Sequence, residues 1–109
     1  MRDDSVYIHH ITECIGRIEE NTSMGREEFM KSHTLQDAVL RNLQTMSEAT
    51  QRLSEATKAK YPDIEWSRIV AFRNVLAHNY LGIDIEIIWG IIQKDVPELK
   101  RVITSMVRE

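Results

Sequence analysis

The sequence contains few of the residues that define many classes of small protein. Its 109 residues include one cysteine, two prolines and four glycines. The single cysteine, Cys14, excludes an intrachain disulfide framework and a cysteine-rich zinc site. So few glycines and prolines exclude collagen-like and proline-rich chains and leave few sharp turns for an all-β fold. No run approaches the ~20 apolar residues of a transmembrane helix, so we expect no membrane partner.

The chain also lacks an excess of positive charge. Fourteen Lys and Arg residues stand against seventeen Asp and Glu residues, which gives a net charge of -3 at pH 7. A protein that coats nucleic acid needs a broad positive field, so this balance excludes that class but not a small local RNA site. The first four residues are polar and acidic, whereas a secretory signal would be basic and then apolar. These features predict a cytoplasmic protein.

Helical periodicity is the strongest pattern in the sequence. The chain is 42% hydrophobic and 28% charged, which suits one folded domain over residues 1–109 but not two domains with good cores. Apolar residues three and four apart predict helices over residues 4–20, 34–60 and 63–80, with a short helical turn at 27–31. Tyr61-Pro62 ends the second of these, because the residue before a proline avoids the α region.

Two helical segments are expected in the C-terminal third. Residues 83–92 are rich in isoleucine and predict a helix that is apolar on more than one side. Pro97 fits the first turn of a last helix over 97–108. The sequence therefore predicts an all-α fold, an up-and-down bundle of four to five helices. The excess of apolar residues favours a homodimer, the alternative being a fully central helix.

Two apolar stripes define the expected core. The first helix carries Ile8, Ile11, Ile15 and Ile18. Its start can be capped by Asp3, Asp4 or Ser5. The long helix carries Leu35, Val39, Met46, Ala49, Leu53 and Ala56, with Asn42 as a polar member of the stripe.

Arg73 lies within an apolar sector of the 63–80 helix. At 100° per residue it falls near the middle of a sector that also holds Trp66, Ile69, Val70, Phe72, Leu76, Ala77 and Tyr80. An arginine there is costly unless it is paired or lies at a watery interface. A structural interpretation pairs it with an acidic residue such as Glu48. A functional interpretation uses its planar fork of donors to bind phosphate oxygens.

His78 and Asn74 form a polar band beside this sector. They are four residues apart and therefore neighbours on the helix. Histidine gives or takes a proton near neutral pH, so His78 with Arg73 suits phosphoryl chemistry. The two are five residues apart, about 140° around the helix, and do not share a face. The reach of the Arg73 side chain, a loosened turn or a two-fold partner would have to close that gap.

The run from Arg73 to Tyr80 has the pattern R-x4-H-x-Y. Further pairs surround it: Tyr61-Pro62 before Ile64-x-Trp66, then Ile85-x3-Trp89, Pro97-x-Leu99 and, in the long helix, Glu48-Ala49. Together these residues resemble HEPN domains, specifically the HepT-like group, over nearly the whole chain. Ser47 departs from the pattern, because a glycine is more usual there.

The resemblance implies an all-helical homodimer that acts as a toxin, a metal-independent endoribonuclease without a cofactor. It implies that Arg73 and His78 are the catalytic residues of a composite site at the dimer cleft, supported by Asn74. The usual partner in this family is an MntA-like minimal nucleotidyltransferase antitoxin, which attaches AMP to the motif tyrosine, here Tyr80. RNA is the expected substrate, and DNA is not, because DNA lacks the 2′-OH needed for attack on the adjacent phosphate.

Two alternatives remain open from the sequence. The first is a non-catalytic module that binds nucleotide or RNA, or serves as a scaffold that positions a nucleotidyltransferase. The second is a structural dimerisation bundle in which Arg73 closes a buried ion pair. Replacing Arg73 with alanine would unfold the structural bundle, whereas in the enzyme it would remove activity with limited loss of stability.

Other polar residues carry weaker signals. His9 with Glu13, and His10 with Cys14, have the i, i+4 spacing that can hold a metal, but two side chains are too few, so no metal site is expected. Cys14 is expected to be a small buried apolar residue. Three cations are candidates for local contacts to RNA, namely Lys31, Arg41 and Arg68.

Overall fold

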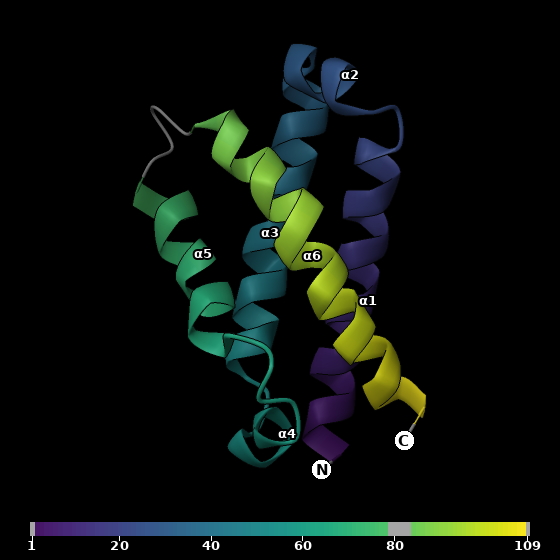
Figure 1. Cartoon of the computed structure of the whole chain (residues 1–109), viewed down its shortest axis with the longest axis vertical. Helices are drawn as coiled ribbons and strands as arrows, with labels where there is room; N and C mark the ends of the chain where they lie inside the picture. Colours follow the sequence, from purple (N-terminus) through teal and green to yellow (C-terminus); the bar gives the residue numbers. More distant parts are fainter. Residues whose placement is uncertain (1, 79–83, 109) are drawn as a thin grey trace.

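The computed structural model describes the backbone of residues 2–78 and 84–108, and the side chains within these ranges apart from those of residues 2, 3 and 73–78. Its helices are α1 (Arg2–Thr22), α2 (Arg26–Lys31), α3 (His33–Gln51), α4 (Glu55–Ala59), α5 (Trp66–His78) and α6 (Ile85–Arg108). Figure 1 shows α1, α3 and α5 running alternately up and down, with α6 crossing them diagonally. The predicted all-α up-and-down bundle is confirmed, with six helices in the described ranges.

The predicted stripes supply much of the core. Ile11, Ile15 and Ile18 of α1 are buried, and so are Val39, Met46 and Ala49 of α3. Ile8 and Leu35 are half-buried and pack against this cluster. The long helix α6 closes the core with Ile88, Ile91, Ile92, Val96, Leu99, Val102, Ile103 and Met106.

The short helix α2 closes one end of the bundle, where a helical turn was predicted. Phe29 is fully buried, and its ring centroid lies 5.3 Å from that of Trp89 on α6. Gln36 of α3 donates its side-chain amide to the carbonyls of Phe29 (3.0 Å) and Met30 (3.1 Å). Ser32 caps α3 by accepting the backbone N–H of Leu35 at 3.1 Å. Gly25, with φ 94°, makes the turn before α2, a conformation that glycine adopts without strain.

The prediction of one helix over residues 34–60 is wrong. The helix α3 ends at Gln51, and α4 begins again at Glu55. Ser54 interrupts the run because its hydroxyl accepts the Thr57 N–H at 3.2 Å, which makes it the N-cap of α4. Leu53 stays buried at this break, but Ala56, which was expected in the core stripe, is exposed.

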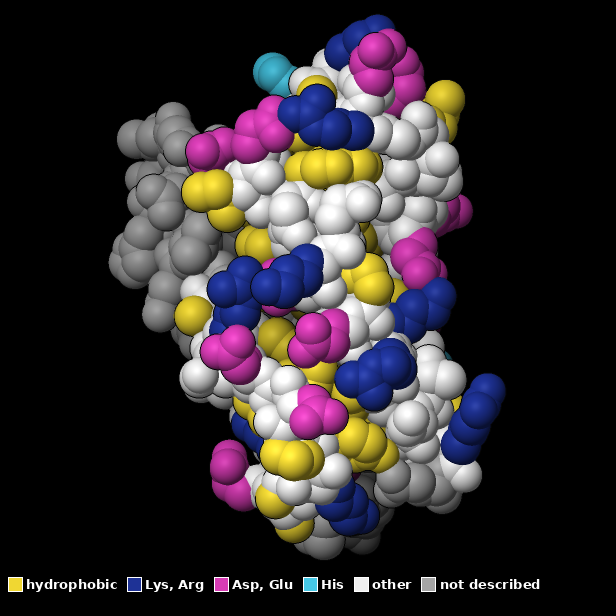
Figure 2. Space-filling model, viewed as in Figure 1, with side chains coloured by type: hydrophobic (Ala, Val, Ile, Leu, Met, Phe, Trp, Pro, Cys, Tyr) yellow, Lys and Arg dark blue, Asp and Glu magenta, His cyan; other side chains and the backbone are white. Residues whose placement is uncertain are grey.

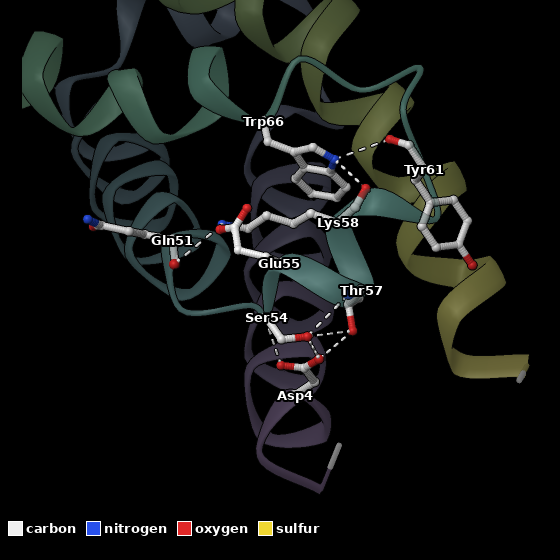
Figure 3. Close-up of polar contacts among 8 residues, drawn as sticks. All are labelled: Asp4, Gln51, Ser54, Glu55, Thr57, Lys58, Tyr61 and Trp66. Carbon is white, nitrogen blue, oxygen red and sulfur yellow. Dashed lines mark hydrogen bonds and ion pairs between the residues drawn. The ribbon is translucent and has the colours of Figure 1, made fainter.

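Asp4 closes the α4 end of the bundle instead of capping the first helix. The carboxylate accepts the Ser54 N–H (3.0 Å) and the Ser54 hydroxyl (2.7 Å), and it also accepts the Thr57 hydroxyl (Figure 3). Asp4 is only 4% exposed. Burial alone would raise the pKa of Asp4, but the hydrogen bonds from Thr57 and Ser54 outweigh it and lower that pKa below its usual value. The capping prediction is therefore wrong, because α1 begins at Arg2 and already includes Asp3, Asp4 and Ser5.

Pro97 does not begin a last helix, as the sequence had suggested. The helix α6 is continuous from Ile85 to Arg108, with Pro97 in its interior. A proline leaves the carbonyl of residue i−4 without its usual donor. Here both Pro97 and Gln93 are exposed, so water can reach the carbonyl that loses its partner.

The isoleucine-rich start of α6 buries one face within the chain. Ile88, Ile91 and Ile92 are buried, Ile85 is half-buried, and Ile87 remains 56% exposed. An exposed isoleucine is consistent with the predicted second apolar side, and the homodimer remains a prediction. In the described ranges, no helix combines the length and the hydropathy needed to cross a bilayer.

Candidate active site

Trp66 fixes the beginning of α5, the helix that carries the R-x4-H pattern. Its indole N–H donates to the carbonyls of Lys58 (3.1 Å) and Tyr61 (3.2 Å), as Figure 3 shows. Both carbonyls lie at the end of α4 and in the turn that follows it. The motif context thus includes the residues that join the α4–α5 connection to the first turn of α5, namely Tyr61-Pro62 and Trp66.

The first half of α5 is held on two sides. Ile69 and Phe72 are buried, and α5 packs along α3. On another side, Arg68 donates from Nε to Asp95 Oδ1 (2.9 Å) and from Nη2 to Asp95 Oδ2 (3.1 Å). The hydrogen bonds to Asp95, followed by its charge, raise the pKa of Arg68, which therefore stays charged. These contacts set the direction in which α5 carries the residues beyond Phe72.

Two of the cations proposed for RNA contacts are engaged by carboxylates. Arg68 is held by Asp95 in the bidentate pair between α5 and α6. Lys31 lies 3.7 Å from Glu27 and 3.6 Å from Glu28 on its own helix. The third candidate, Arg41, has no carboxylate within 4 Å among the described residues and lines a pocket between α1 and α3.

The helical register of α5 places the predicted catalytic positions. Position 73 comes four residues after the buried Ile69 and seven after Trp66, so the helical period puts it on the same side of α5 as these two residues. Position 78 comes seven residues after Ala71 and eleven after Ser67, and both of these are exposed. The register thus keeps the two positions on different sides of α5. The side chains of Arg73, Asn74 and His78 lie outside the described residues, as does all of Tyr80, so their roles remain predictions.

A pocket of about 550 Å³ lies beside the first half of α5. Trp66, Ser67 and Val70 line it from α5, and Glu55 and Lys58 line it from α4. Position 74 follows Val70 by four residues and Ser67 by seven, so it falls on the same side of the helix as this pocket. The volume is within the ~300–1,000 Å³ range of small-molecule sites.

Several further residues of the motif context lie in the core of the bundle or pack against it. Trp89 packs on Phe29, and Leu99 is fully buried in the core. Ser47, where a glycine is more usual in the family, is 1% exposed and donates its hydroxyl to the Leu43 carbonyl at 2.8 Å. The Ser47 hydroxyl therefore has a hydrogen-bond partner, although it is buried where the family more usually has a glycine.

The histidine and cysteine residues of α1 do not assemble three ligands. Within the described ranges, no group of three His, Cys, Asp or Glu side chains lies close enough to hold a metal ion. Cys14 is 4% exposed, as expected for a small apolar residue. Burial, reinforced by Glu13 and opposed by Arg17, raises the pKa of the Cys14 thiol, so it stays protonated and weakly nucleophilic at neutral pH.

Sequence reasoning missed the contacts that hold α4 and the beginning of α5. The Asp4–Ser54–Thr57 contacts join positions about fifty residues apart, so no local pattern announces the acidic partner. A local signal did exist for the cap, because Ser54 precedes the first turn of α4. The indole contacts of Trp66 had no signal beyond the proximity of Tyr61-Pro62.

Comparison with known proteins places the chain in a family. The ribonuclease HepT-like family model matches residues 11–106. A Thermococcus cleftensis protein named a probable ribonuclease HepT is 33% identical over 100 residues, which cover 91% of each chain. A Caldanaerobacter subterraneus subsp. tengcongensis protein named as a candidate RNase is 31% identical over 110 residues, covering 100% of this chain and 98% of the relative.

A third relative is about twice as long as this chain. It is a Methanocaldococcus jannaschii protein named as a gamma-glutamylcyclotransferase and candidate RNase, 36% identical over 109 residues. The match covers 99% of this chain but only 49% of the relative, so the chain spans about half of that protein's length. No solved structure matches this chain.

The family match covers α5 and most of the length of the helices that pack around it. It agrees with the ribonuclease family that the R-x4-H-x-Y pattern predicted. The chain therefore belongs to the ribonuclease HepT-like family.

Proposed function

We propose that this protein is a metal-independent endoribonuclease and the toxin of a toxin–antitoxin pair, with Arg73 and His78 as its catalytic residues. The family match over residues 11–106, which spans the whole R-x4-H-x-Y run, is the observation that carries this proposal. The anchoring of α5 by Trp66 and Arg68 supports it, because catalysis needs groups held in fixed positions. We also propose that residues 1–109 act as one domain, which a single core cluster between Ile11 and Met106 supports.

In the proposed reaction His78 takes the proton of a ribose 2′-OH, which then attacks the adjacent phosphorus. Arg73 stabilises the negative charge that develops on the phosphoryl oxygens. The bond to the 5′-oxygen of the next nucleotide breaks, leaving a 2′,3′-cyclic phosphate on one product. That 5′-oxygen leaves with the proton that His78 took from the 2′-OH, so His78 acts first as the base and then as the acid.

A homodimer accounts for the separation of the two catalytic positions on α5. Five residues correspond to about 140° around a helix, so one copy presents Arg73 and His78 on different sides. Two copies related by a two-fold axis can bring Arg73 of one chain beside His78 of the other. The exposed Ile87 at the start of α6 is an apolar residue that such a partner could cover.

Regulation by an antitoxin is implied by the resemblance to the family, in which the motif tyrosine matches Tyr80. We propose that a nucleotidyltransferase antitoxin attaches AMP to the Tyr80 hydroxyl, and that Asn74 supports the catalytic site of Arg73 and His78. The added nucleotide brings bulk and a negative phosphate, which would exclude RNA by steric overlap and charge repulsion. Co-expression with the antitoxin should add one AMP to the wild-type chain by intact-mass spectrometry and none to Tyr80→Phe.

The catalytic proposal is tested by comparing the wild type with His78→Ala and with His33→Ala, an exposed histidine on α3 that serves as the matched control. We expect the wild type and His33→Ala to cut RNA in EDTA and to leave a 2′,3′-cyclic phosphate, and folded His78→Ala to be inactive. Folded, dimeric wild type that binds RNA without cutting it would instead establish a non-catalytic binding module.

A further inference from the structure

A second pocket, of about 520 Å³, lies between α1 and α3, away from the pocket beside Trp66. His10, Glu13 and Arg17 line it from α1, and Arg41 and Asn42 line it from α3. These two helices pack together along much of their length, which holds the two walls at a fixed separation.

The charge of this pocket is unusual for the molecule. Figure 2 shows acidic and basic side chains interleaved along α6, and Arg26, Arg68 and Lys100 each contact a carboxylate. Arg17 and Arg41, by contrast, have no carboxylate within 4 Å among the described residues. Glu13 is the acidic residue of the described lining, and it lies 3.8 Å from His9. Cations therefore outnumber anions here in a chain whose net charge is negative.

The hydrogen-bond donors of the pocket match a phosphate group. Two guanidinium groups from opposite walls offer planar forks of N–H donors, the geometry that suits phosphate oxygens. Asn42 uses one amide N–H on the Ala38 carbonyl (2.8 Å), which leaves the second N–H for a ligand. The described lining holds no Phe, Tyr or Trp ring, and its one ring is the small imidazole of His10, so it suits the nucleic-acid backbone better than a nucleobase.

The pocket and α5, the helix that carries positions 73 and 78, lie on different sides of α3. The helices α1 and α5 both pack on α3, and Figure 1 shows them on either side of it. Because α5 runs antiparallel to α3, the end of α5 that carries position 78 reaches the middle of α3, as Figure 1 shows. Arg41 belongs to that middle segment of α3.

We propose that the pocket between Arg17 and Arg41 binds a backbone phosphate of the RNA substrate at a distance from the scissile bond. This inference rests on the proposed ribonuclease function. It gives the acidic chain a local source of RNA affinity, separate from the residues that cut.

Binding is measured by fluorescence anisotropy with a labelled 20-nucleotide 2′-O-methyl RNA, which the proposed reaction cannot cleave. The pocket variant is Arg17→Gln/Arg41→Gln. The matched control is Lys94→Gln/Arg101→Gln, which removes two exposed α6 cations that also lack a described carboxylate partner. We expect the pocket variant to weaken binding about tenfold and to lower the salt slope of log K by about 0.7, the value for one phosphate of a single strand, and the control to change Kd less than about threefold. Equal weakening in both variants would overturn the proposal.

Three further measurements test the phosphate in this pocket and exclude other roles for it. Glu13→Gln removes the acidic wall and should tighten RNA binding, whereas an unchanged Kd would count against a phosphate in this pocket. Isothermal titration with AMP should show weaker binding than RNA. Tight AMP binding that the pocket variant abolishes, with RNA binding intact, would assign the site to a free nucleotide. Light scattering should give the same molar mass for the wild type and the pocket variant. A lower mass for the pocket variant would mean that Arg17 and Arg41 belong to a subunit interface and not to a phosphate site.

Cleavage kinetics separate this inference from the proposed function. If both hold, the pocket variant raises KM for RNA and keeps kcat. If the wild type binds 2′-O-methyl RNA through the pocket but never cuts natural RNA, the ribonuclease proposal fails and the pocket stands. If the pocket variant cuts with the wild-type KM, the pocket proposal fails and the ribonuclease stands.

Discussion

The two ends of the bundle differ in the chemistry that closes them. At the α2 end, the buried Phe29 ring packs on Trp89, and the contact is apolar. At the α4 end, a buried carboxylate holds Ser54 and Thr57, and a nearby indole holds two backbone carbonyls. The burial of apolar side chains depends little on pH and does not fix the relative orientation of the groups. Hydrogen bonds do fix that orientation, and they weaken when a partner such as a carboxylate is protonated. The polar end is the one from which α5 departs toward the predicted catalytic positions.

The largest effect is expected at the apolar end. Phe29→Ala removes a fully buried aromatic side chain and leaves a cavity against Trp89, so it should lower the free energy of unfolding by about 3–5 kcal/mol. Urea unfolding followed by circular dichroism measures the change. A loss below about 1 kcal/mol would show that the α2 end contributes little to the fold.

A smaller effect with a pH signature is expected at the polar end. Asp4→Asn should cost about 1–3 kcal/mol at pH 7, because Asn has one acceptor oxygen and cannot accept the Ser54 N–H as well as the two hydroxyls. The pKa of Asp4 is lowered in the folded chain, so its stabilisation is full above the unfolded value of ~3.9 and is lost as the pH falls through the lower folded value. Wild type and variant should converge in stability in that acidic range, and Phe29→Ala should keep its deficit there. Curves that stay parallel below pH 4 would contradict this role for Asp4.

The smallest effects compare two helix caps. Ser32→Ala removes the cap of α3 and should cost about 1 kcal/mol, the usual value for an N-cap. Ser54→Ala removes a cap and a hydrogen bond to Asp4, so it should cost more, about 2 kcal/mol. Thermal and urea unfolding of the two variants side by side give the difference. Equal losses would mean that Asp4 adds nothing to the α4 cap.

Much of the fold was predictable because burial in a helix leaves a periodic pattern. The isoleucine stripe of α1, the short α2 and the stop at Tyr61-Pro62 all follow from spacing and backbone restriction. The break at residues 52–54 did not, because Leu53 and Ala56 continue the period through it, and the partner that stabilises the break is Asp4, far away in sequence.

The sequence contained a signal that α6 is continuous, but the preference of proline for the first turn of a helix was given more weight. Pro97 is common in a first helical turn, and that preference suggested a new helix. The buried residues Ile92, Val96, Leu99 and Ile103 keep one helical phase across the proline, which fits a single helix. Where a proline lies on the exposed side of such a stripe, the phase of the stripe is the better guide.

The candidate site was predictable as a motif, and the structure adds its supports. The R-x4-H-x-Y run and its surrounding pairs led to the HepT-like family, which the family match confirms. The roles of Trp66, Arg68 and Asp95 in fixing α5 depend on tertiary contacts and could not be read from spacing. The sequence likewise contained no sign that Arg17 of α1 and Arg41 of α3 line the same pocket.

A complementation assay tests the central claim most directly, namely that Arg73 and His78 of different copies together cut RNA. Arg73→Ala and His78→Ala chains are purified separately, shown to be folded, and then mixed under conditions in which subunits exchange. Each variant alone should be inactive, and the mixture should recover about a quarter of wild-type activity, because random exchange leaves half the dimers with one intact site of two. A mixture that exchanges subunits but remains inactive, beside an active wild type, would contradict the composite site.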